Sequence, residues 1–403
     1  MKFAKFILWN KVFHSTVFFV CIALVALADI LGFFLMQGDS DFRRGIAVYS
    51  PEQNSVRQSQ FTVDGVAYAR EGIDTLEIIA TDRGGGERAF PFDRHAVMYD
   101  GDPILELASY TAEVDLPEDG EYRLVARMKT TEGEVVDGIA LDVRVDAAST
   151  PSPFVTFSAT HFLTLAVPAL FAIGIILWAR RGSDKTKQIC RIILAVGISA
   201  FELVIMYNLA LSRHFRISYD LPLHLCSIAI WLIPVLMLTQ NKKLKEFLYQ
   251  LLFLWGLAGA SQALLTPDLS MYPVMGVKYI CYFGTHGLII AGVLFATYVD
   301  GHRPKWRAFP KVLLTTVICG GIAFGVSHLV RLLPPYEAGG YFYLAYPPIS
   351  GSLIDVFVDL LGPSPYYMIG LLLLLPIAQA ILMLPVWLAD TVVRGVRGKR
   401  GQA

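Results

Sequence analysis

Apolar stretches long enough to cross a lipid bilayer make up most of the chain. A helix must contain roughly 20 mainly apolar residues to span about 30 Å of hydrocarbon. This criterion predicts a polytopic α-helical membrane protein with one N-terminal span and a seven-helix bundle. The eight predicted spans are residues 12–36, 155–179, 190–211, 221–240, 246–266, 276–298, 311–332 and 365–389.

Residues 38–150 have a different pattern. Segments 73–80 and 122–129 alternate apolar and polar side chains, and segments 104–116 and 135–145 do so less regularly. Alternating runs separated by turn signals are typical of a small antiparallel β-sandwich. We therefore expect an immunoglobulin-like all-β module, which contains no Cys and hence no disulfide, after the first span. The turn signals are Asp64-Gly65, the glycines at 84–86, Asp100-Gly101 and Asp119-Gly120.

These patterns divide the chain into four parts. They are an N-terminal signal anchor (1–37), the β module (38–150), the seven-span domain (151–393) and a basic tail (394–403). The first part has a second interpretation, because Ala26-Leu27-Ala28 resembles a signal-peptidase site. The apolar run continues to Met36, which favours an uncleaved anchor.

Composition and charge support a membrane protein and give its orientation. The chain is 55% apolar and 17% charged, whereas soluble domains have about 25% charged residues. Its net charge of zero does not fit a nucleic-acid-binding protein, which needs a basic excess. With both termini in the cytoplasm, the inner segments hold 19 Lys and Arg and the short outer loops hold 4. The positive-inside rule then predicts that the β module lies outside the cytoplasm.

Ionisable side chains inside spans are costly, so each is a candidate functional residue. At 1.5 Å per residue, Glu202 lies roughly 13 Å deep and His286 roughly 15 Å deep in their spans. His224 and Cys226 begin the span 221–240 from outside. We therefore expect one cavity in the outer half of the bundle. Further candidates near its mouth are His161, Asp220, Gln262, Asp268 and His328.

The residue types at these positions fit nucleophilic catalysis. His224 and Cys226 point about 200° apart around a helix, so Cys226 as nucleophile would take its base from another span, namely His286. Asp220 would fix the tautomer of His224, and Gln262 would donate to an oxyanion. Each residue also has a structural interpretation, since a lone Cys in a span usually packs and a deep His needs a hydrogen bond.

Several motifs resemble those of a known family. The string Leu221-Pro-Leu-His-Leu-Cys226 resembles the signature of the YwaF-like bacterial integral membrane family, and the likeness covers residues 155–390. The family is more remotely similar to a eukaryotic multi-span family that includes a cysteine-dependent phospholipid acyltransferase. That resemblance implies Cys226 as the acyl-accepting residue and the motif histidines as bases. The other matching motifs are Phe157–His161, Trp255–Ala260, Leu265–Asp268, Thr285–Gly287 and Leu361–Tyr366.

We expect a membrane-embedded acyltransferase or lipid-modifying enzyme that acts at the outer face. Its substrate would be a membrane lipid or acyl chain, with no cofactor and no nucleic acid, and an unidentified ligand or protein would bind residues 38–150. Two alternatives stay open. One is a zinc-dependent membrane hydrolase that uses the outer-face histidines, and the other is a non-enzymatic receptor or carrier.

Overall fold

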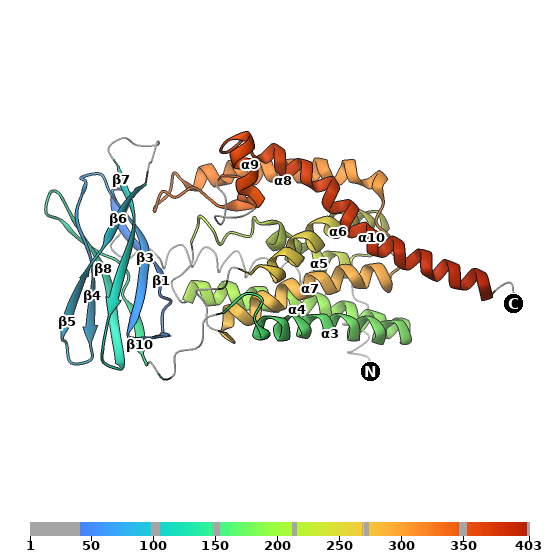
Figure 1. Ribbon diagram of the computed structural model, residues 1–403, viewed down its shortest axis with the longest axis horizontal. Coiled ribbons are helices and arrows are strands. Elements are labelled where there is room, and N and C mark those ends of the chain that lie inside the picture. The colour runs from blue at the N-terminus through green and yellow to red at the C-terminus, as the bar shows by residue number, and fades with distance from the viewer. Residues whose placement is uncertain are drawn as a thin grey trace.

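The computed structural model of the chain consists of a β module followed by a bundle of helices (Figure 1). The structure describes residues 41–97, 105–146, 148, 154–211, 216–267, 269, 274–345 and 353–400. The predicted anchor, residues 1–37, lies outside the described residues. The predicted fold class is thereby confirmed as a β-sheet module ahead of a helical membrane domain.

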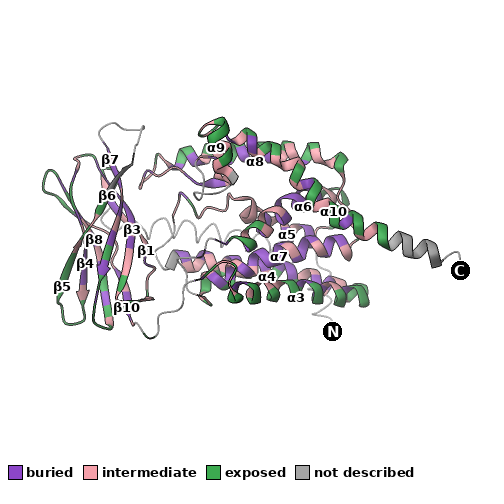
Figure 2. Ribbon diagram, in the orientation of Figure 1, coloured by how far each residue is buried: buried purple, intermediate pink, exposed green. Residues whose placement is uncertain are grey.

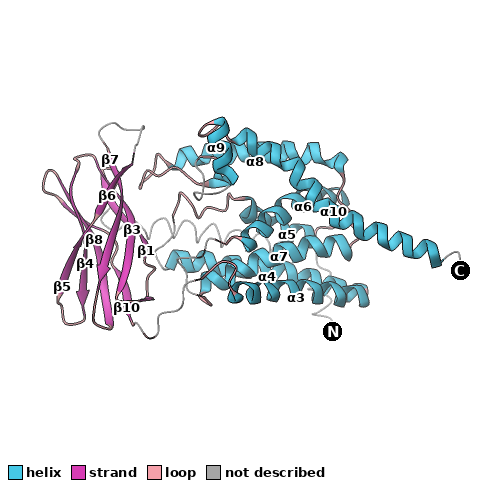
Figure 3. Ribbon diagram, viewed as in Figure 1, coloured by secondary structure: helices cyan, strands magenta, loops and turns pink. Residues whose placement is uncertain are grey.

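The β module consists of two sheets (Figure 3). One sheet has the order β1-β3-β7-β6, and the other has the order β2-β10-β8-β4-β5, with β9 paired to β8. The strands of the first sheet are β1 (Arg44–Ser50), β3 (Gln60–Ala69), β6 (Asp93–Val97) and β7 (Glu106–Asp115). Those of the second are β2 (Ser55–Arg57), β4 (Ile73–Asp82), β5 (Glu87–Pro91), β8 (Gly120–Thr130), β9 (Val135–Asp137) and β10 (Leu141–Val145).

The two sheets share one apolar core, which explains the alternation in the sequence. Every second residue of β8 from Tyr122 to Thr130 is buried, and β7 shows the same alternation. Leu124 and Met128 of β8 join Tyr110 and Val114 of β7 in a single cluster. Inward-facing residues of both sheets therefore meet as in a sandwich.

The turn predicted at Asp64-Gly65 is wrong. Both residues lie inside strand β3 and pair with Thr111 and Tyr110 of β7. A Cβ at Gly65 would lie 2.1 Å from the hydroxyl oxygen of Tyr110, which donates a hydrogen bond of 2.8 Å to the carbonyl of Ala47. This glycine therefore makes room for a tyrosine rather than for a turn.

Seven of the described helices correspond to the seven spans predicted after the β module. Six of the described helices have the length and apolar character to cross a membrane. The exception is α5, whose 14 residues extend only about 21 Å, because Pro222 and its neighbours form a turn instead of the first helical residues. The helices are α3 (Ala159–Arg181), α4 (Asp184–Leu211), α5 (Leu225–Leu238), α6 (Lys242–Leu265), α7 (Val277–Tyr298), α8 (Phe309–Val330), a short α9 (Leu353–Leu361) and α10 (Met368–Arg400).

Helix α7 is the centre of the bundle, and its glycines allow close approach on several sides. Figure 2 shows α7 mostly buried, whereas α3 and α10 expose much of their surface. A Cβ at Gly287 would lie 2.3 Å from Pro168 of α3, and one at Gly292 would lie 2.9 Å from Ile233 of α5. Small residues of this kind let membrane helices pack backbone to backbone.

The β module lies at the end of the bundle where α3, α5 and α7 begin (Figure 1). We call this the module-facing end and the opposite one the far end. The loop after α8 carries Tyr336, whose hydroxyl donates to the carbonyl of Phe42 at 2.5 Å. The ring of Tyr336 meets that of Tyr68 edge-on at 5.0 Å. The module is thus in direct contact with the bundle.

The close contact at Gly287 predicts a matched pair of stability effects. Gly287→Ala should destabilise the detergent-solubilised protein by about 1–3 kcal/mol, because its new methyl group overlaps Pro168. Gly174→Ala is the control, because no atom lies within 4 Å of the Cβ it would add. Thermal unfolding in detergent measures both, and equal melting temperatures would contradict the packing described here.

Candidate functional site

The start of helix α5 carries two of the candidate catalytic residues. His224 is the N-cap residue of α5, with an extended backbone conformation, and Cys226 lies in the first turn. The preceding residues, 216–224, form turns and so interrupt the helical bundle. The first backbone N–H groups of α5 have no partner within the helix, and the backbone of Cys226 and Ser227 interacts with the Cys226 thiol.

Cys226 is partly buried and packs against the interior of the helical bundle. It packs against an apolar cluster that includes Leu288 and Ile289 of α7, and α4, α5 and α7 all pack on one another. The thiol also has hydrogen-bonding contact with Ser227. The buried carboxyl group of Glu202 on α4 acts electrostatically on the thiols of both Cys226 and Cys281.

His286 has a defined tautomer in the structure. Its Nδ1 lies 2.7 Å from the carbonyl oxygen of Tyr282, one turn earlier on α7, and a carbonyl oxygen only accepts. The proton is therefore on Nδ1, and Nε2 has the free lone pair. The ring also packs on that of Tyr282, with centroids 4.4 Å apart. His286 and Cys226 do not hydrogen-bond to each other.

His224 is surrounded by tyrosine rings and has one nitrogen without a partner. The rings of Tyr219, Tyr341 and Tyr343 lie with centroids 5.3–5.6 Å from the imidazole. The imidazole hydrogen-bonds to the backbone of Tyr219, and no polar atom of the described residues is within hydrogen-bonding distance of the buried Nε2. A buried polar atom of this kind is costly unless a ligand satisfies it.

Of three further candidates, Asp220 and Gln262 can be placed in the structure. The carboxylate of Asp220 accepts the backbone N–H of Arg216 at 2.7 Å, while the backbone of Tyr219 supplies the hydrogen bond to the His224 ring. Gln262 is exposed near the end of α6. Asp268 lies outside the described residues.

His161 and His328 differ in their surroundings. His161 is fully buried, with Nε2 2.8 Å from the carbonyl oxygen of Leu264 and Nδ1 accepting the N–H of Phe157 at 3.0 Å. His328 is exposed on α8 and packs against Phe324. Among the described residues no three His, Cys, Asp or Glu side chains are grouped as metal ligands would be. The histidine positions thus give no support to the zinc hydrolase.

Comparison with known proteins assigns the helical part of the chain to a family. A family model described as the TMEM164 family matches residues 156–384, more than half of the chain. The chain belongs to the TMEM164 family. No curated protein matches its sequence.

Two solved structures share weak likeness with this TMEM164-family chain. CopC from Methylosinus trichosporium OB3b is 17% identical, with a TM-score of 0.18, over 26% of this chain and 94% of CopC. Astrotactin-2, a vertebrate-specific, perforin-like membrane protein, is 10% identical, with a TM-score of 0.17, over 52% of this chain and 39% of astrotactin-2. Neither score is high enough to assign a fold or a function.

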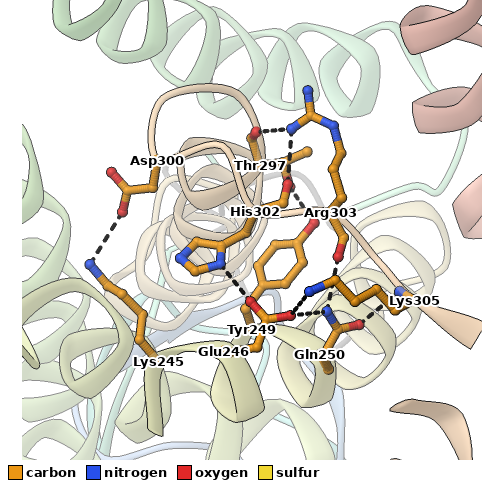
Figure 4. A network of polar contacts seen from close by, with 9 residues as sticks. All are labelled: Lys245, Glu246, Tyr249, Gln250, Thr297, Asp300, His302, Arg303 and Lys305. Atoms are coloured by element: carbon orange, nitrogen blue, oxygen red, sulfur yellow. Dashed lines mark hydrogen bonds and ion pairs between the residues drawn. The ribbon is translucent and has the colours of Figure 1, made fainter. Parts of the chain in front are cut away.

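A second polar cluster, which the sequence analysis missed, lies at the far end of the TMEM164-family bundle (Figure 4). The carboxylate of Glu246 on α6 binds Nδ1 of His302 at 2.9 Å and Nζ of Lys305 at 2.6 Å. Arg303 forms two hydrogen bonds with Asp390 of α10, at 2.7 and 3.1 Å, and the interaction raises the pKa of the guanidinium. This cluster ties the loop after α7 to α6 and α10.

The hydrogen bonds of His161 predict a structural role for this residue. His161→Phe would leave the carbonyl of Leu264 and the N–H of Phe157 without their partner, at about 1–3 kcal/mol for each buried group. His328→Phe is the control, since His328 is exposed and its substitution should leave the melting temperature within about 1 °C. The hypothesis fails if both variants melt at the same temperature.

Proposed function

We propose that this TMEM164-family protein is a membrane-embedded acyltransferase or related lipid-modifying enzyme that uses Cys226 as its nucleophile. The observation that supports this most is the position of Cys226 in the first turn of α5. A helix N-terminus favours a negative charge, and cysteines at such positions are the reactive ones in many enzymes. The other described cysteines lie within longer helices: Cys190, Cys281 and Cys319.

The proposed reaction has two steps. The sulfur of Cys226 attacks the carbonyl carbon of a lipid ester, a carbon–sulfur bond forms, and the bond to the leaving lipid oxygen breaks. A histidine takes the thiol proton and returns it to the leaving oxygen. In the second step the hydroxyl of an acceptor attacks the thioester, and its proton passes to the sulfur through the same base. The acyl chain is transferred with no net redox change.

His286 is the proposed base, and His224 is the proposed substrate contact. The free lone pair on Nε2 of His286 fits a proton acceptor, since its Nδ1 is bound to Tyr282. His286 and Cys226 are not joined by a hydrogen bond in the structure. Catalytic hydrogen bonds commonly tighten only when substrate binds. His224 has a buried Nε2 that a donor group of the substrate would satisfy. Glu202 of α4 is buried and has no proposed role in the reaction, because a negative charge near the Cys226 thiol opposes thiolate formation.

The motif resemblance agrees with this assignment. We propose that the helical domain is a relative of the YwaF-like bacterial proteins and, more remotely, of the cysteine-dependent phospholipid acyltransferases. We also propose that the β module is immunoglobulin-like and binds an unidentified ligand or protein. In support of that fold, the hydroxyl of Tyr122, near the start of β8, bonds the backbone of Glu118 at 2.9 Å, a contact found in immunoglobulin-like sandwiches.

We propose that the module-facing end lies outside the bacterial inner membrane. Basic residues gather at the far end, where α3 ends in Arg180 and Arg181 and α6 begins with Lys242 and Lys243. The basic ends of membrane helices usually face the cytoplasm. The Cys226 site would then act on the outer leaflet.

The proposed nucleophile predicts a cysteine-specific acyl label. After incubation with a phospholipid that carries an alkyne-tagged acyl chain, the protein should carry a tag that hydroxylamine removes, because thioesters are cleaved by it. Cys226→Ala should lose the tag, and His286→Ala should slow its appearance about 10²-fold or more. Cys190→Ala, at another buried cysteine, is the matched control and should label normally. Full labelling of Cys226→Ala would rule out the proposal.

The proposed orientation predicts opposite accessibility of the two ends. Single cysteines introduced at Glu132 of the exposed β8–β9 turn and at Lys185 of the far end should differ in intact cells. A membrane-impermeant maleimide should label the first and leave the second unlabelled until the cells are opened. The reverse result would place the module in the cytoplasm.

A further inference from the structure

The β module and the bundle meet through a partly buried carboxylate. Glu337, in the loop after α8, accepts a hydrogen bond of 2.5 Å from the hydroxyl of Tyr49 on β1 and one of 3.1 Å from the hydroxyl of Ser218. Arg216 forms an ion pair of 3.5 Å with the same carboxylate. One side chain therefore joins the module, the loop after α8 and the segment before α5. We call Tyr49, Arg216, Ser218 and Glu337 the docking node.

The docking node is well defined chemically. The guanidinium of Arg216 stacks over the Tyr49 ring, 3.8 Å from its centroid, so the two residues contact each other as well as Glu337. Burial, with the neighbouring Glu337 charge, raises the pKa of Tyr49 well above its usual value. The phenol therefore remains protonated and donates its hydrogen bond to the carboxylate at any physiological pH.

Apolar contacts beside the docking node fix where the module rests on the loop after α8. Tyr336, next to Glu337, packs into a cluster of the module that includes Val66, Tyr68 and Leu107. Its hydroxyl bonds to the backbone of Phe42. The module therefore docks on the loop through both an apolar and a charged contact.

The docking node continues directly into the residues that carry the candidate site. The carbonyl of Ser218 accepts the N–H of Gly340 at 2.9 Å, and the hydroxyl of Tyr341 bonds to the carbonyl of Ile217. Tyr341 and Tyr343 then contact the ring of His224, two residues before Cys226. A continuous set of contacts thus leads from Tyr49 of the module to the first turn of α5.

We infer that docking of the β module positions the His224–Cys226 turn, with Tyr49, Arg216 and Glu337 as positioning residues. The inference extends the proposed function, on which its consequence for acyl transfer rests. The placement of Cys226 itself is measurable without any acyl transfer. Release of the module would free the loop after α8 and the segment 216–224 together, so Cys226 would lose its fixed surroundings.

The test is the rate at which N-ethylmaleimide alkylates Cys226 across a range of pH. The full-length chain with its other cysteines replaced by Ser is purified in detergent, and Tyr49→Phe and Glu337→Gln are introduced separately. Each should change the alkylation rate at least five-fold and shift its pH profile. Tyr122→Phe is the matched control, because it removes a tyrosine hydrogen bond that lies wholly within the module. Parental rates and profiles in both node variants would overturn the inference.

Two further measurements separate positioning from general loosening. A second background retains only Cys190, which is fully buried on α4, and it should alkylate at the parental rate in both variants. An equal rise at Cys190 would contradict the inference, because it would indicate loosening of the whole bundle. The double variant should change the rate by less than the sum of the two single effects, because both changes weaken the same contact, and additive effects would also contradict the inference.

The alkylation experiment can fail or succeed independently of the acyl-labelling test of the proposed function. Loss of acyl labelling is measured on Cys226→Ala, whereas alkylation is measured on proteins that retain Cys226. A protein that never accepts an acyl chain but still shows the node-dependent alkylation disproves the enzyme and supports the positioning. Normal acylation with alkylation independent of the docking node supports the enzyme and disproves the positioning.

Discussion

Backbone polar groups at the start of helix α5 must be satisfied inside the protein, and much of the module-facing end depends on this constraint. Lipid offers no hydrogen bonds, so a non-helical segment is tolerated only where protein covers it. Residues 216–224 are such a segment. Gly340, Tyr341 and the carboxylate of Asp220 supply the partners of their backbone. The loop after α8 is therefore folded over the segment and is available to contact the β module.

The need for hydrogen bonds inside the protein also distinguishes the structural histidines of the bundle from those that can act on a ligand. Both ring nitrogens of His161 are hydrogen-bonded to backbone groups, so neither is available to a substrate. His286 uses one nitrogen, and His224 has a buried nitrogen with no partner among the described residues. A neutral imidazole becomes a base or a ligand contact only through a nitrogen that the fold has not used. The hydrogen-bond pattern thus directs attention to His224 and His286.

The sequence predicts the helices well because apolar length is a local property. It also predicts strands β4 and β8, whose alternation is regular. It fails at Gly65, where the reason for a glycine is the Tyr110 side chain of a neighbouring strand. It fails also at α5, since counting apolar residues ignores the effect of Pro222 on the helix start.

The docking node could not be predicted from local sequence patterns, because Tyr49 and Glu337 are 288 residues apart in the chain. One signal was present: Glu337 is the single charged residue between Arg331 and Asp355, in a loop otherwise made of apolar, aromatic and small residues. Such a carboxylate needs a partner when the loop packs. The contacts of Tyr341 and Tyr343 with His224 were missed for the same reason, since both tyrosines come from the same distant loop.

The two ends of the bundle are held in different ways, and this difference bears on where the protein can move. At the far end, Glu246, Arg303 and Asp390 join α6, the loop after α7 and α10 by short ion pairs, all within the helical domain. At the module-facing end, Glu337 joins the bundle to a separately folded module. A contact between two folded units is generally easier to open than one within a single packed core. The module-facing end is therefore the end at which the two folded parts can separate more easily, while the far end keeps the helices in register.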